Sequence, residues 1–126
     1  MLLSKIKKFY SETIFGKSGY KLDEHYAQYL INTSTVLEDG EGIVIARVDH
    51  HPYFKDKVVA SELVWYVPPE KRNSSLGYRL FKKYEQWAKD NSADIIMVDC
   101  LDDKVAKFYE SQGYKLVQRT YMKELT

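Results

Sequence analysis

Two consecutive prolines at 68–69 separate two segments of different periodicity in the middle of the chain. The residues before them, VVASELVWYV, are rich in β-branched and aromatic types and predict a strand over 58–67. Proline has no backbone N–H to donate, so the strand ends there. After a short polar run, apolar residues recur at helical spacing and predict a helix that begins at Ser74 or Ser75 and ends near Asn91. This order of strand, turn and helix favours an α/β protein.

The N-terminal third shows helical spacing as well. Its apolar residues predict an amphipathic helix over 2–14, ended by Gly16 and Gly19. Asp23 is then placed to cap a second helix. β-Branched runs follow on both sides of Asp39-Gly40, a pair typical of hairpin turns. We therefore expect a helix pair followed by a hairpin.

The last third alternates between strand and helix patterns. Residues 93–100, ADIIMVDC, form an apolar run typical of a strand buried on both faces of a sheet. A helix then begins at Asp102 or Asp103 and ends at Gly113, which acts as its C-terminal cap. The remaining segment, 114–125, predicts one bent strand or two short ones. The whole order predicts an α/β fold with a mixed sheet.

Length and charge favour one globular domain. The chain has 126 residues, 44% hydrophobic side chains and a net charge of +1. We expect a single domain, 1–126, with a helix pair over 1–34 and the sheet region over 35–126. The balanced charge does not by itself favour nucleic acid or a membrane, and no apolar run approaches the roughly 20 residues of a membrane span. With one cysteine and no leader-like start, a cytoplasmic protein is expected.

The predicted helix start at Ser74 or Ser75 has the properties of an anion site. The first backbone N–H groups of a helix are unpaired and lie at the positive end of the helix dipole. Arg72 could add a fork of donors, and Gly77 lets the backbone approach a ligand closely. The same residues also fit a proline turn and a serine-capped helix that binds nothing. Both interpretations stay open at this point.

Two segments resemble motifs of one family. VPPEKRNSSLGYRL is similar to motif A of the GNAT superfamily of acyl-coenzyme A dependent N-acyltransferases, V-x-P-x-x-R-G-x-G-x-G-x-x-L. The matching residues, in or within one position of register, are Val67, Pro69, Arg72, Gly77 and Leu80, whereas Asn73 and Ser75 replace two glycines. Downstream, DDKVAKFYESQGYKL resembles the family's next helix and strand through Tyr109, Glu110, Gly113 and Tyr114. The likeness spans about 36–124 and is closest to small phage- and prophage-type members.

This resemblance implies a GNAT-like fold, in which two parallel strands of a mixed sheet splay apart between flanking helices. It implies transfer of an acetyl group from acetyl-coenzyme A to an amine by direct attack. The backbone of Trp65, Tyr66 and Val67 would contact pantetheine and the acyl carbonyl, and Tyr109 would act as the acid for the leaving thiolate. The pyrophosphate would be wrapped by Arg72, Asn73, Ser74, Ser75, Leu76 and Gly77.

Glu62 is the candidate general base, because a carboxylate in a half-buried cleft can have its pKa raised toward neutrality. On the predicted strand it shares a face with Val64 and Tyr66. A salt bridge is the alternative role for Glu62, and His50 or His51 is the alternative base. Asp49, these histidines and Cys100 fit no zinc spacing, so we expect no metal, and Cys100 is expected to be a buried thiol.

The leading hypothesis is thus an acyl-coenzyme A dependent N-acyltransferase whose acceptor, a small molecule or a protein with an amine, is not named by any residue. One alternative is a non-catalytic interaction protein on a GNAT scaffold, favoured by Asn73 and Ser75. Another is a phage-encoded acyltransferase, acting in a host cytoplasm on a nucleobase or a nucleic-acid-binding protein. A homodimer is expected only by analogy with similar folds.

Overall fold

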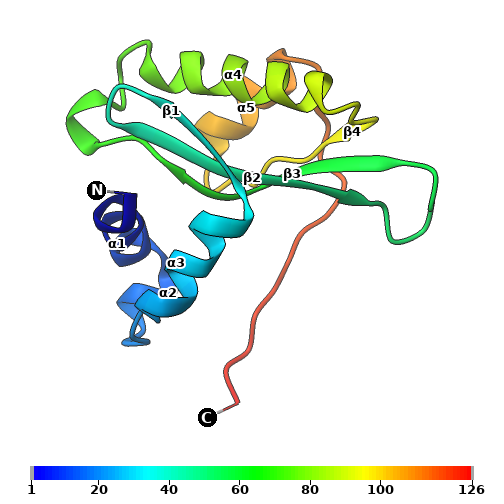
Figure 1. The fold of residues 1–126 in the computed structure, drawn as a ribbon. Helices are drawn as coiled ribbons and strands as arrows, with labels where there is room; N and C mark the ends of the chain where they lie inside the picture. Colours follow the sequence, from blue (N-terminus) through cyan, green and yellow to red (C-terminus); the bar gives the residue numbers. More distant parts are fainter. Residues whose placement is uncertain (1, 126) are drawn as a thin grey trace.

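A computed structural model describes residues 2–125 (Figure 1). The elements, in chain order, are α1 (Leu2–Glu12), α2 (Ile14–Lys17), α3 (Glu24–Thr33), β1 (Thr35–Asp39), β2 (Gly42–His50), β3 (Val58–Tyr66), the 3₁₀ turn η1 (Pro69–Lys71), α4 (Leu76–Asp90), β4 (Ile95–Ile96) and α5 (Asp103–Ser111). The four strands form one sheet in the order β1-β2-β3-β4. β1, β2 and β3 are antiparallel neighbours, whereas β3 and β4 are parallel. The predicted α/β fold with a mixed sheet is confirmed.

Helices cover both faces of the sheet (Figure 1). On one face, α4 buries Leu80, Tyr84 and Ala88 against Val44 and Ala46 of β2. On the other face, α1 and α3 pack onto the alternate residues of β2 and β3; the buried residues of this cluster are Ile6, Ala27, Ile43, Ile45, Val64 and Tyr66. The sheet is therefore the middle layer of three, and β2 is buried from both sides.

The N-terminal segment forms three helices and not the predicted pair, because the first predicted helix is divided at Thr13. Thr13 ends α1 and caps α2, because its Oγ1 accepts the Gly16 N–H at 3.3 Å. Gly16 therefore lies inside a helix and does not end one. Glycine is needed there because a Cβ would stand 2.4 Å from the carbonyl oxygen of Tyr10. The Asp23 cap is confirmed, since its carboxylate accepts the Tyr26 N–H at 3.0 Å.

Three predictions for the C-terminal third are wrong. The strand over 93–100 is reduced to Ile95–Ile96 and is only half-buried, because it forms the edge of the sheet. Cys100, expected to be buried, is exposed for the same reason. Residues 114–125 form no strand, since no neighbouring strand lies beside them in the described structure.

Candidate active site

The parallel strands β3 and β4 separate after a short contact. They pair at Val59 with Ile95 and at Ala60 with Ile96, and the Met97 N–H still donates to the Ala60 carbonyl at 2.8 Å. Beyond this bond, no backbone hydrogen bond joins β3 to residues 98–100 in the described part of the chain. The edge of β3 that faces β4 is thus left without a backbone neighbour.

Two side chains occupy the next positions of the interrupted ladder. In a continued parallel ladder the Met97 carbonyl would accept the Glu62 N–H, and the Asp99 N–H would donate to the Glu62 carbonyl. Instead the Tyr84 hydroxyl donates to the Met97 carbonyl at 2.8 Å, and the Asp99 N–H donates to Oε1 of Glu62 at 3.0 Å. These bonds satisfy the backbone groups while the strands stay apart.

A β-bulge lies at the same place on β3. Ile45 of β2 pairs with Val64, whereas the next residue, Ala46, pairs with Glu62, so Leu63 is the extra residue. Glu62 therefore lies on the face of the sheet that carries α4, opposite to Val64. The prediction that these two side chains share a face is wrong, because strict alternation fails at a bulge.

The pKa of the Glu62 carboxyl is raised in this position. Burial raises the pKa of its carboxyl to about 7, and the nearby negative charge of Asp99 adds to the rise, while the hydrogen bond from the Asp99 N–H opposes it. A carboxyl that titrates near neutrality can take up a proton during turnover at physiological pH. The structure places the alternative base His51 in the β2–β3 loop, where its Nδ1 accepts the Tyr53 N–H. This loop lies about 13 Å along β3 from Glu62, at the spacing of a strand.

Tyr109 of α5 lies in a cluster of rings. Its ring centroid is 6.0 Å from that of Phe81 and 5.7 Å from that of Tyr114. Burial raises the pKa of the Tyr109 hydroxyl above its ordinary value, and the charge of Glu62 raises it further. The hydroxyl is therefore protonated at neutral pH and available as a donor.

A second feature is a cavity of about 520 Å³ at the N-terminus of α4. Its lining residues are Gly40, Glu41, Lys71, Ser74, Ser75, Leu76 and Arg79. Oγ of Ser74 accepts the Leu76 N–H at 3.3 Å, so Ser74 provides the side-chain bond expected of a cap, whereas Ser75 does not. A Cβ at Gly77 would meet no atom within 4 Å, so the fold itself does not require glycine there. Space next to a helix N-terminus suits the close approach of an anionic ligand.

Two basic residues of this cavity were missed in the sequence. Lys71 ends the 3₁₀ turn, and Arg79 lies one helical turn after Ser75, whose Oγ accepts from its guanidinium at 2.6 Å. Arg79 also pairs with Asp39 at 3.1 Å and thereby holds the β1–β2 turn against α4. This hydrogen bond lowers the pKa of the Asp39 carboxyl. The spacing of four residues from Ser75 was the signal that could have identified Arg79.

Arg72 and Asn73, also expected to wrap the pyrophosphate, form their polar contacts with other residues of the chain. Arg72 pairs with Glu12 of α1 at 2.6 Å, and its Nε donates to the Val67 carbonyl at 2.9 Å. Asn73 accepts from Lys104 of α5 at 3.4 Å. Thus only residues 74–77 of the predicted set lie at the cavity or beside it.

The three strand residues expected to contact pantetheine lie at the end of β3. Trp65 pairs with Val44 of β2, and its ring packs against Tyr84 at 5.6 Å. Tyr66 is buried on the opposite face, against α1 and α3. Val67 follows directly and is half-buried. Since β2 occupies one edge of β3, the opposite edge of Trp65 and Tyr66 is available, whereas the Val67 carbonyl accepts from Nε of Arg72.

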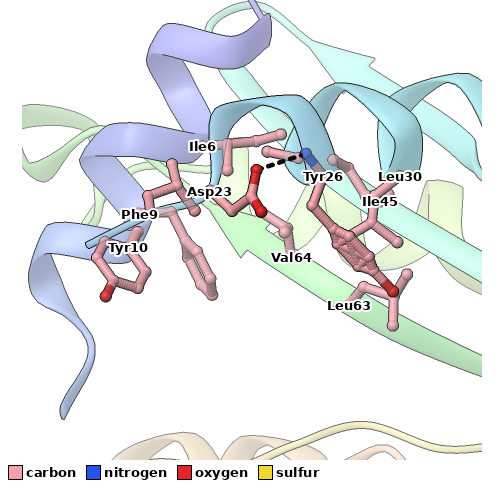
Figure 2. A pocket seen from close by; sticks show the side chains of 11 residues that line it. Ile6, Phe9, Tyr10, Asp23, Tyr26, Leu30, Ile45, Leu63 and Val64 are labelled. Atoms are coloured by element: carbon pink, nitrogen blue, oxygen red, sulfur yellow. Dashed lines mark hydrogen bonds between the residues drawn. The ribbon is translucent and has the colours of Figure 1, made fainter. Parts of the chain in front are cut away.

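An apolar groove of about 210 Å³ lies on the face that carries α1 and α3 (Figure 2). It is lined by Ile6, Phe9, Tyr10, Leu22, Asp23, Tyr26, Ala27, Leu30, Ile45, Leu63 and Val64. Leu63, the extra residue of the bulge, contributes to this lining from β3. Asp23 is the one acidic residue in the lining, and its carboxylate caps α3.

Residues 2–125 include no group of three or more His, Cys, Asp or Glu side chains placed to hold a metal ion. Among the same residues no helix is both long enough and apolar enough to cross a membrane. The site features of the described chain are a splayed strand pair, a bulge and a cavity at the N-terminus of α4.

The family model of the GNAT acetyltransferases matches residues 4–114, and the chain belongs to this family. No curated protein matches the sequence.

Solved structures share the fold at low identity. A transcriptional regulator from Bacillus halodurans C-125 is 16% identical with a TM-score of 0.72, over 98% of this chain and 93% of the other. A protein described as an acetyl transferase, from Pyrococcus furiosus, is 21% identical with a TM-score of 0.71, over 98% and 93%. AAC(6')-Iy, solved with the bisubstrate analogue CoA-S-monomethyl-acetylneamine, is 14% identical with a TM-score of 0.64, over 98% and 91%.

Proposed function

We propose that the chain transfers an acetyl group from acetyl-coenzyme A to an amine. The observation that carries this proposal is the separation of β3 from residues 98–100. The open edge of β3 leads through the turn at 68–75 into the N-terminus of α4. An extended amide chain such as pantetheine can add to an open strand edge through backbone hydrogen bonds. The cavity at residues 74–77, with Lys71 and Arg79, then suits the pyrophosphate.

In the proposed reaction the amine nitrogen attacks the thioester carbonyl carbon. The C–N bond forms as the C–S bond breaks, and backbone N–H groups at residues 65–67 polarise the carbonyl. Glu62 takes a proton from the amine, directly or through a water in the opened gap. Tyr109 donates its proton to the leaving sulfur and regains one from Glu62, so the protons balance.

We further propose that the acceptor carries its amine on an apolar body. The groove of Figure 2 includes Leu63 in a lining of mainly aliphatic and aromatic side chains, with Asp23 as the one carboxylate among these residues. A polycationic acceptor would need more negative charge than this lining provides. Turnover of 2-phenylethylamine should therefore exceed that of neamine at equal concentration. The reverse order would overturn this part of the proposal but not the acetyl transfer.

Calorimetry and kinetics test the main proposal. We expect acetyl-coenzyme A to bind the full chain, and the absence of binding at millimolar concentration would sink the proposal. Tyr109→Phe should lower kcat by roughly 10²-fold, the scale of a lost acid–base group, with little change in coenzyme affinity. The matched control is Tyr114→Phe, in the same ring cluster, because the Tyr114 hydroxyl is bonded to Glu85 at 3.0 Å. Equal losses in both variants would indicate a packing role instead.

One observation favours a second candidate, a non-catalytic interaction protein. Arg72 and Asn73 bind Glu12 and Lys104 and do not line the anion cavity. A protein that no longer binds coenzyme could keep these contacts as purely structural links. The same calorimetry separates the two candidates, since this one predicts no heat of binding with acetyl-coenzyme A.

A further inference from the structure

The ion pair between Glu12 and Arg72 joins two parts of the molecule that are distant in the sequence. Glu12 is the last residue of α1, and Arg72 follows the 3₁₀ turn that leads into α4. Nη2 of Arg72 lies 2.6 Å from one carboxylate oxygen of Glu12 and 2.8 Å from the other. Within residues 2–125, no other ion pair joins α1 to residues 67–75.

The same guanidinium occupies the end of β3. Its Nε donates to the Val67 carbonyl at 2.9 Å, and its Cζ lies 6.0 Å from the centroid of the buried Tyr66 ring. In the proposed function, the backbone of residues 65–67 contacts the extended amide chain of pantetheine. As long as Arg72 holds it, the Val67 carbonyl is not free to accept from an amide of pantetheine.

Arg72 is close in the chain to the cavity at the N-terminus of α4. Lys71 and Ser74 line this cavity, whereas the polar contacts of Arg72 are with Glu12 and Val67. A pyrophosphate carries more negative charge than one carboxylate, and it accepts the same bidentate hydrogen bonds from a guanidinium. Arg72 can therefore exchange one anionic partner for another.

We propose that Glu12 is a positioning residue that keeps Arg72 in an inhibitory contact until the coenzyme binds. Arg72 then leaves Glu12 and Val67 for the phosphate oxygens, and the Val67 carbonyl becomes free for pantetheine. Binding of the coenzyme must supply the free energy that separates the pair. The two side chains are 44% and 40% exposed, so this cost is equivalent to about two- to fivefold in affinity. This role of Glu12 rests on the proposed function.

Calorimetry with acetyl-coenzyme A tests this contact on the full chain. Glu12→Gln should bind the coenzyme about two- to fivefold more tightly than the wild type, because a neutral amide holds Arg72 less strongly. The matched control is Glu70→Gln, which removes the same charge from a side chain with no ion pair in the described chain. Burial raises the pKa of the Tyr66 hydroxyl, and the charges of Glu12 and Glu70 both add to the rise, so the two carboxylates act on the same region. Equal tightening in Glu70→Gln would mean a general charge effect and contradict the role of Glu12.

A double-mutant cycle shows whether Glu12 acts through Arg72. In Arg72→Gln, the further change Glu12→Gln should leave the affinity for acetyl-coenzyme A unchanged, because the residue on which Glu12 acts is gone. The direction of the effect separates this role from a purely structural one, since loss of a link that only holds α1 in place would not tighten coenzyme binding. Wild-type affinity in Glu12→Gln, or equal tightening with and without Arg72, would show the inference to be wrong while the proposed function stands. If no variant binds the coenzyme, the proposed function fails, and the role of Glu12 fails with it.

Discussion

At the scale of single residues, Glu62 combines a structural and a chemical property. Its Oε1 accepts the Asp99 N–H at 3.0 Å where the strands separate, and its pKa lies near 7 because the carboxyl is buried. Glutamine keeps the acceptor oxygen but cannot ionise. Glu62→Gln therefore separates the hydrogen bond from the titration.

The raised pKa of Glu62 predicts a difference between the wild type and Glu62→Gln in how stability depends on pH. In the unfolded chain the carboxyl titrates at 4.5, and in the folded protein at about 7. Its contribution to the free energy of unfolding is complete below pH 4.5 and is lost as the pH rises to about 7, by an amount on the order of 3 kcal/mol. Glu62→Gln should lack this loss in chemical denaturation at a series of pH values. In the wild type, kcat/KM should rise through pH 7, because only the ionised form accepts a proton.

Gly77 gives a second residue-scale prediction. Because a Cβ there meets only open space, Gly77→Ala should raise the free energy of unfolding by roughly 0.5–1 kcal/mol, as replacement of a helical glycine usually does. Gly77→Leu should fold equally well but weaken acetyl-coenzyme A binding at least tenfold, since its side chain enters the space of the ligand. Thermal melts and calorimetry measure the two effects. Unchanged coenzyme affinity in Gly77→Leu would place the pyrophosphate elsewhere.

At the scale of elements, a side chain of α4 maintains the opening between β3 and β4. Tyr84 is fully buried, and its ring stacks on Trp87 while its hydroxyl reaches the Met97 carbonyl. The helix therefore provides the hydrogen-bond donor that β3 does not provide for the Met97 carbonyl. A site formed in this way exists before any ligand binds and needs little rearrangement.

Removal of this hydroxyl should let the strands close. In Tyr84→Phe the ring contacts remain, and the free Met97 carbonyl can accept the Glu62 N–H in a continued ladder. We expect the amide of Glu62 to exchange more slowly with deuterium, thermal stability to change little, and acetyl-coenzyme A affinity to fall about tenfold. Faster exchange at Glu62 with unchanged affinity would contradict this role of Tyr84.

At the scale of the whole molecule, the homodimer expected by analogy with similar folds would link folding to protein concentration. A dimer that gains stability from association has a melting temperature that rises with protein concentration. We expect such a rise for the full chain between 1 and 100 µM, on the order of several degrees, whereas a monomer would show none. Differential scanning calorimetry at several concentrations provides the measurement.

The sequence predicts best the features that local chemistry determines. Caps at Asp23 and Asp102 depend on a side chain and an N–H three residues away, and both are present. The partner of Arg72 could not be predicted, because Glu12 is 60 residues distant and meets it only in the folded chain. The side on which Glu62 lies also escaped prediction, since the bulge is a property of the pairing between two strands. The strand predicted over 114–125 does not form, because no strand pairs with it in the described chain. The local sequence does not show whether a neighbouring strand is present.

The bulge at Leu63 also bears on how this chain should be compared with others. Residues 58–62 and 64–66 belong to one strand, yet the alternation of their side chains between the two faces of the sheet is offset by one position. An ungapped alignment with a relative that lacks the insertion would match a carboxylate facing α4 to a side chain facing α1. Functional residues transferred in that way would be assigned to the wrong side of the sheet, and a one-residue gap at position 63 prevents the error.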